Sequence, residues 1–70
     1  MKITDSISFG RTVRQRRKEL GYTQADLSHV TGLSVSFLSD LERGKKTTEL
    51  GKALYLASML GLDLIMESRG

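Results

Sequence analysis

The sequence predicts a small all-α domain of four helices, followed by one short strand. The 70-residue chain contains no proline, and apolar residues recur at helical spacing through most of its length. Glycines close four successive segments of this spacing, at positions 21, 32, 44 and 61. The length allows one domain, 1–70, and no second one.

Residues 9–20 form the first predicted helix. Phe9, Val13 and Leu20 lie on one face, and Arg17 shares that face with them. A charged side chain on an apolar face must either be paired or turn outward. We therefore expect Arg17 to need a partner, with a phosphate contact as the open alternative.

The next two predicted helices are short and begin at recognisable caps. Thr23 is a good N-cap, and Asp26 three residues later gives a near-capping box. Ser34 caps the third helix, which directs Leu38 and Leu41 inward. The segment 23–44 thus contains two short helices joined at Gly32, where a tight turn needs a positive φ.

The fourth predicted helix carries an inward stripe of Leu50, Ala53, Leu54, Ala57 and Leu60. Leu56 and Met59 fall outside that stripe and give the helix more apolar surface than one core uses. This surplus is one reason to expect a second chain.

The tail has a different periodicity. Leu62, Leu64 and Met66 alternate with their neighbours, which predicts a strand over residues 62–67. One strand alone is not stable. We therefore expect two chains to pair these residues in a homodimer. A frayed tail is the competing interpretation.

Composition limits the ways in which so short a chain can be stabilised. With no cysteine and one histidine it has neither a disulfide framework nor a structural zinc or other metal site. Association with a second copy remains. The absence of cysteine fits a reducing cytosol. We expect a cytoplasmic protein without membrane contact, because a signal-like start and a run of about 18 apolar residues are both absent.

The positive charges are clustered. The formal net charge is +3, and basic residues gather in two segments, namely Arg11, Arg14, Arg16, Arg17 and Lys18 in the first and Arg43, Lys45 and Lys46 in the second. Such clusters suit a polyanionic partner. Solvated helix faces would show the same pattern.

The segment 23–44, TQADLSHVTGLSVSFLSDLERG, has the spacing of a helix-turn-helix motif. In such motifs the second helix enters the major groove of DNA. Helical hairpins with a glycine turn are common, so the spacing alone is a moderate signal.

Longer stretches resemble the Cro/λ-repressor (XRE) family of helix-turn-helix regulators. They are VRQRRKELGYTQADLS, TGLSVSFLSDLERGK and LGKALYLASMLGL, and together they cover most of the chain. The resemblance implies a four-helix λ-repressor-like fold, no cofactor, and a bacterial, nucleoid-associated repressor that binds double-stranded operator DNA.

Within the family the chain is most similar to small antitoxins of the HipB type. That similarity implies a C-terminal strand joining two protomers, repression of the chain's own operon, and a HipA-type kinase toxin as partner. A stand-alone or phage-type repressor without a toxin is the alternative.

The second helix of the motif, called the recognition helix, begins at Ser34. The predicted base-contacting residues lie at its start, and they are Ser34, Val35, Ser36 and Ser39, with Asp40 as a weaker candidate. Well-known family members carry glutamines at the positions of Val35 or Ser36. Serine hydroxyls discriminate poorly between bases, and valine can only touch a thymine methyl. Specificity is then expected to depend on DNA shape, on bridging water or on basic side chains nearby.

The predicted phosphate-contacting residues are Gln24, Arg43, Lys45, Lys46, Arg14 and Arg16. For Gln24 the role is implied by the resemblance and suits a helix N-terminus. The resemblance also implies a buried salt bridge between Arg17 and Glu42.

Catalysis is not expected. The chain has no cysteine, no pair of carboxylates on one face and no phosphate-binding glycine loop. A module that only binds another protein is the remaining alternative, and the basic clusters argue against it as the sole role.

Overall fold

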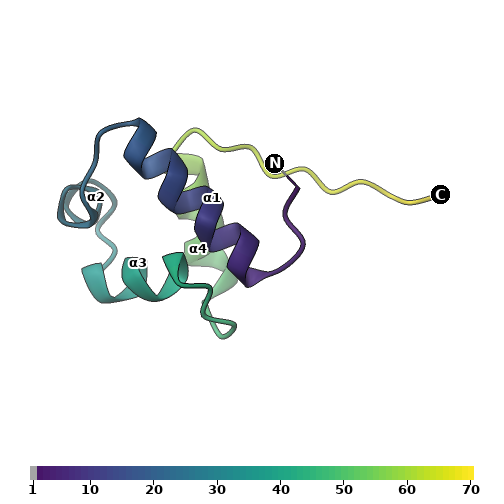
Figure 1. Cartoon of the computed structure of the whole chain (residues 1–70), viewed down its shortest axis with the longest axis horizontal. Helices are drawn as coiled ribbons and strands as arrows, with labels where there is room; N and C mark the ends of the chain where they lie inside the picture. Colours follow the sequence, from purple (N-terminus) through teal and green to yellow (C-terminus); the bar gives the residue numbers. More distant parts are fainter. Residues whose placement is uncertain (1) are drawn as a thin grey trace.

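Four helices make up the computed structural model, which describes residues 2–70 (Figure 1). They are α1 (Ser6–Glu19), α2 (Gln24–Thr31), α3 (Val35–Glu42) and α4 (Leu50–Met59). The prediction of an all-α domain is confirmed. No helix in the described part of the chain is long and apolar enough to cross a membrane.

Side-chain caps fix where α1 and α2 begin. Thr23 Oγ1 accepts the N–H of Asp26, and the Asp26 carboxylate accepts the N–H of Thr23, both at 3.0 Å. Asp5 and Ser8 form the same reciprocal pair at the start of α1. The hydrogen bond from the Thr23 backbone lowers the pKa of Asp26, because it stabilises the ionised carboxylate.

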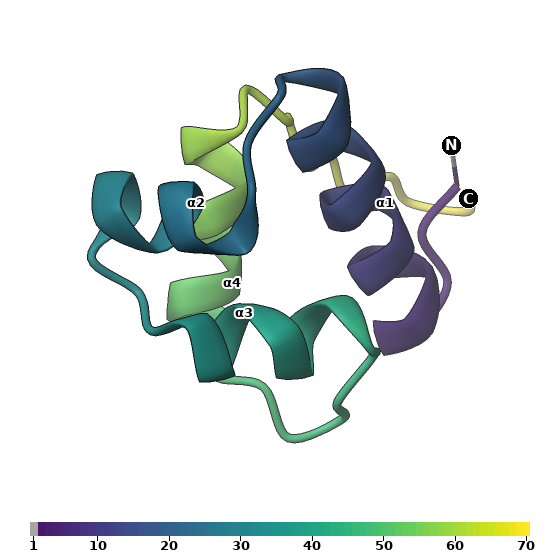
Figure 2. The ribbon, with the colours of Figure 1, turned by 60° about the vertical axis from the view of Figure 1, so that its left-hand side comes forward.

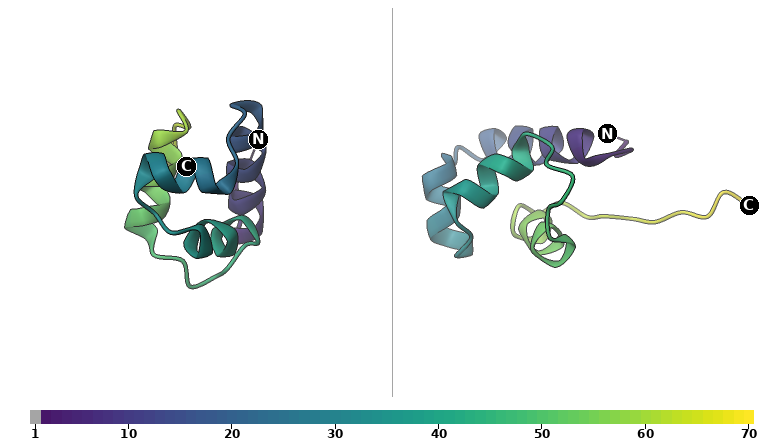
Figure 3. Two further views of the ribbon diagram at one scale, coloured as in Figure 1. Left: turned by 90° about the vertical axis from the view of Figure 1, so that its left-hand side faces the viewer. Right: turned by 90° about the horizontal axis from the view of Figure 1, so that it is seen from below.

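In the left view of Figure 3, α1 and α4 lie on opposite sides of the domain, α2 passes across the space between them, and α3 runs below α2. Their inward side chains form one core. Its buried members come from all four helices and from the residue that follows α4, and they are Val13, Leu27, Leu38, Leu41, Ala53, Leu56 and Leu60. Phe9, Leu33, Phe37 and Leu62 pack around this cluster.

The predicted inward stripe of α4 is partly wrong. Ala53, Ala57 and Leu60 are buried as expected, but Leu50 and Leu54 are exposed. Leu56, which was placed off the stripe, is fully buried. Positions 53, 56, 57 and 60 have helical spacing too, so periodicity could not choose between the overlapping stripes.

The tail leaves the domain in an extended conformation (Figure 1). Leu62 still packs against the core and donates its N–H to the Ala57 carbonyl at 2.9 Å. Residues 62–67 form no strand within the described chain. A ladder needs a second strand, and one chain by itself does not supply it.

Gly10 allows α1 and α3 to approach closely, which sequence inspection did not identify. A Cβ atom at this buried position would collide with the carbonyl oxygens of Leu41 and Glu42, the second at 2.8 Å. Both atoms belong to the backbone of α3 and cannot move aside cheaply. Gly10 therefore sets the distance between the first helix and the recognition helix.

Replacing Gly10 by alanine should push these helices apart and lower the free energy of unfolding by about 1–3 kcal/mol. Gly51→Ala is the matched control, because nothing lies within 4 Å of its Cβ position. Alanine in a helix should stabilise there by about 0.5–1 kcal/mol at most. Urea unfolding of both variants measures the difference, and equal stability of the two would contradict the close approach.

Candidate nucleic-acid interface

A tight turn connects α2 and α3. Gly32 ends α2 with φ 78° and donates its N–H to the Ser28 carbonyl at 2.9 Å. Two residues later Ser34 Oγ accepts the N–H of Phe37 at 3.0 Å and starts α3. The predicted cap and the predicted glycine turn are both observed. After this turn, α3 runs along one edge of the domain (Figure 2).

One side of α3 is buried and the other is open. Leu38, Leu41 and Glu42 face the protein interior. Four residues spaced by three, one and three positions share the opposite face, and we call them the recognition stripe: Ser36, Ser39, Asp40 and Arg43. Ser34 and Val35 are exposed beside it at the helix N-terminus. All four residues predicted to contact bases therefore lie on or next to this stripe.

The structure brings Arg17 and Glu42 together in a buried ion pair. Arg17 Nε donates to Glu42 Oε2 at 2.7 Å, and Nη2 donates to Oε1 at 3.0 Å. The side chains are only 9% and 3% exposed. Arg17 Nη1 also donates to the Tyr22 carbonyl at 2.8 Å. Hydrogen bonding to Glu42 raises the pKa of Arg17, against the opposing effect of burial.

Gln24 joins the same carboxylate. Its Nε2 donates to Glu42 Oε1 at 3.1 Å. Sequence reasoning assigned Gln24 to a phosphate alone and missed this contact, which spans 18 residues along the chain. An amide nitrogen carries two hydrogens, so one N–H of Gln24 remains for a phosphate. Glu42 on α3 thus binds side chains from α1 and α2.

Two of the three basic residues that follow α3 are already paired, both with Asp40. Arg43 Nη2 donates to Asp40 Oδ1 at 2.6 Å, and Lys45 Nζ donates to Asp40 Oδ2 at 3.4 Å. Lys45 and then Arg43 lower the pKa of Asp40 through these hydrogen bonds. Lys46 is exposed and has no ion pair among residues 2–70. The spacing of Asp40 and Arg43 is the signal that could have revealed the first pair.

The loop that carries these cations is fixed to the start of α1. Ser6 Oγ donates to the Gly44 carbonyl at 2.8 Å. Gly44 has φ 87°, and a Cβ there would lie 2.8 Å from Ile7 Cγ1. A side chain at this position would displace Ile7, so glycine is needed for both its conformation and its size.

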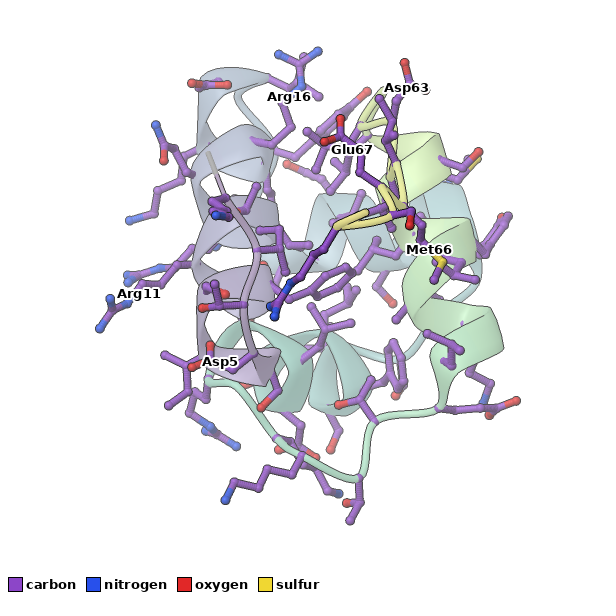
Figure 4. The ribbon with its side chains drawn as sticks, turned by 90° about the vertical axis from the view of Figure 1, so that its right-hand side faces the viewer. Asp5, Arg11, Arg16, Asp63, Met66 and Glu67 are labelled. Atoms are coloured by element: carbon purple, nitrogen blue, oxygen red, sulfur yellow. The ribbon has the colours of Figure 1, made fainter. Side chains whose placement is uncertain are left out.

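Arg14 and Arg16 lie in different surroundings. Arg14 is exposed on α1 and makes no ion pair in the described part of the chain. Arg16 Nε donates to the Leu60 carbonyl at 2.9 Å, and Arg16 Nη1 lies 3.5 Å from Glu19. Figure 4 shows Arg16 beside the start of the tail. Arg16 connects α1 to the end of α4, which argues against the phosphate contact predicted for it.

The sequence matches the helix-turn-helix family (HTH_3) over residues 13–65. The chain belongs to this family, in its Cro/λ-repressor (XRE) branch. The HTH-type transcriptional regulator y4mF of Sinorhizobium fredii (strain NBRC 101917 / NGR234) is 36% identical over 63 residues, or 90% of this chain and 83% of y4mF. YazB of Bacillus subtilis (strain 168), also an HTH-type transcriptional regulator, is 45% identical over 38 residues, or 54% and 55% of the two chains.

Solved structures of HipB share the fold. HipB in a complex with an O4 20mer has a TM-score of 0.87 at 20% identity, covering 100% of this chain and 99% of HipB. A chain of a HipA–HipB–O2–O3 complex matches with the same score, identity and coverage. Membership of the family makes this protein a DNA-binding transcriptional regulator and not an enzyme.

The buried ion pair leads to a stability prediction. Glu42→Gln removes the counter-charge and leaves Arg17 buried without it, which should cost about 3–5 kcal/mol of unfolding free energy. Glu49→Gln is the matched control, because Glu49 pairs with Lys52 at 3.4 Å on the exposed surface. Exposed pairs contribute about 1 kcal/mol or less. Chemical denaturation of both variants measures the contrast, and a small loss for Glu42→Gln would show that the pair does not hold the motif together.

Proposed function

We propose that this protein is a transcriptional repressor that binds operator DNA as a homodimer, with the N-terminal half of α3 in the major groove. The exposed recognition stripe is the observation that carries the proposal. Its inner side is held by the Glu42 network, so its outer side is presented in a fixed orientation. Motifs of this class read bases with the first residues of the second helix.

The proposed base contacts are Ser34, Val35, Ser36 and Ser39, and the proposed phosphate contacts are Gln24, Arg43, Lys45, Lys46 and Arg14. Hydroxyl groups accept and donate indiscriminately, so direct readout by this helix is weak. Most of the affinity then comes from phosphates and depends strongly on salt. Pairing two such domains on one site restores specificity.

The tail supports the proposed homodimer. Ile65 and Met66 are 78% and 99% exposed in the single chain, and Leu64 is half-exposed. A hollow of about 200 Å³ lies between the start of the tail and the domain, and its lining includes Phe9 of α1, Ala57 of α4 and Leu64 of the tail. A second copy whose tail pairs with this one would cover these side chains and supply the missing strand. Two recognition helices would then meet successive major grooves about 34–36 Å apart.

A toxin partner is the finer part of the proposal. The structural neighbours include HipB in complex with HipA and DNA, which supports an antitoxin that neutralises a HipA-type kinase and represses its own operon. The relatives y4mF and YazB are named as transcriptional regulators without mention of a toxin, and a stand-alone repressor is therefore the second candidate. A kinase-like reading frame beside the gene would support the antitoxin, and its absence would count against it.

Lys46→Gln should weaken binding to operator and random-sequence DNA alike. It should also reduce the log–log salt slope by about one unit, because one phosphate contact is lost. Arg69→Gln is the control, since it changes the net charge equally from the exposed tail. Fluorescence anisotropy at several salt concentrations measures both variants. If the wild-type protein did not bind DNA, or bound it without any dependence on salt, that result would contradict the proposed function.

Aspartate at both Leu64 and Met66 should separate the protomers, because two charges would enter the apolar seam of the paired tails. Val30→Asp is the matched control, since Val30 is an exposed apolar residue of α2 outside the tail. Analytical ultracentrifugation should find the double variant monomeric and the control dimeric. A double variant that still sediments as a dimer would exclude pairing through the tail.

A further inference from the structure

A carboxylate lies among the residues proposed to face DNA. Asp40 is four residues after Ser36 and three before Arg43 on the recognition stripe. Negative charge on a surface that binds a polyanion lowers affinity through repulsion. The position of Asp40 therefore needs an explanation that the helix-turn-helix geometry does not provide.

Both oxygens of Asp40 are engaged by cations. Oδ1 binds Arg43 Nη2 at 2.6 Å, and Oδ2 lies 3.4 Å from Lys45 Nζ. The Asp40 side chain is 30% exposed, whereas those of Arg43 and Lys45 are 72% and 54% exposed. The two cationic side chains are thus largely exposed to solvent, and both bind a carboxylate that is less exposed than they are.

In a DNA complex, phosphate groups would bind the same two cations, Arg43 and Lys45. Carboxylate and phosphate oxygens are equivalent acceptors for guanidinium and ammonium groups. Arg43 and Lys45 keep further N–H groups that could reach a phosphate, but Asp40 offsets part of their positive charge. Each therefore attracts a phosphate less strongly than an unpaired cation would. Lys46 is outside this arrangement, because no acidic partner is found for it in the described chain.

We propose that Asp40 competes with DNA phosphates for Arg43 and Lys45 and thereby lowers the affinity of the protein for DNA of arbitrary sequence. The proposal rests on the placement of α3 against DNA described above. It assigns to Asp40 a specificity-determining role. Because of Asp40, the surface that DNA of arbitrary sequence binds carries one net positive charge fewer than it would without this carboxylate. An operator adds base and shape complementarity, which does not depend on Arg43 and Lys45.

Asp40→Asn tests this role, since it keeps the shape of the side chain and removes its charge. The probe is a 20-base-pair duplex of random sequence, in a titration at several salt concentrations. We expect the variant to bind roughly three- to tenfold more tightly near 0.1 M salt, with a log–log slope steeper by about one unit, because one more phosphate is neutralised.

Asp63→Asn is the matched control. Asp63 lies in the exposed tail, has no ion pair within residues 2–70, and gives the same change in net charge (Figure 4). It should bind the random duplex like the wild type. An equal gain for both variants would mean that total charge is responsible, which would overturn the role of Asp40.

A second pair of variants distinguishes competition of Asp40 for the two cations from simple repulsion between Asp40 and the DNA phosphates. In a protein that carries Arg43→Gln and Lys45→Gln, Asp40→Asn should give little further gain, because no cation remains to be released. A full gain in that background, or equal or weaker binding by the single variant, would overturn the proposal. Failure of both wild type and Asp40→Asn to bind any duplex at low salt would instead overturn DNA binding itself.

Discussion

The carboxylate of Glu42 connects the second helix of the motif to the two helices that precede it. It accepts two hydrogen bonds from Arg17 and one from Gln24, so one side chain of α3 binds both preceding helices. A buried ion pair contributes little net stability when an apolar pair of the same shape is the alternative. Its value here is directional, because a bidentate pair with a third donor permits one orientation of α3 relative to α1.

That orientation determines what the outer side of the motif presents. Gly10 lets the backbone of α1 approach α3 closely, and Ser6 fixes the loop after α3 through Gly44. The interior of the motif is therefore closely packed and hydrogen-bonded, whereas its outer surface carries small hydroxyls and exposed cations. In the proposed complex this surface would contribute shape and charge more than individual base contacts.

Local signals in the sequence predicted the helices well, and long-range partners were harder. The Thr23 cap and the turn at Gly32 depend on residues within a few positions, so the pattern indicated them correctly. The contact of Arg16 with Leu60 spans 44 residues, and no periodicity encodes it. Leu56 was misplaced because two stripes of α4 overlap, and only packing chooses between them. The tail strand stays a prediction, because its partner is another chain.

The Glu42 network is proposed to turn one face of α3 toward DNA. Amide chemical-shift mapping by NMR, during titration with a short duplex, tests this orientation residue by residue. We expect large shifts at Gln24, at residues 34–36, at Ser39 and at residues 43–46, with the amides of 62–70 left unchanged. Shifts concentrated on the tail or on the exposed side of α4, with α3 unaffected, would contradict it.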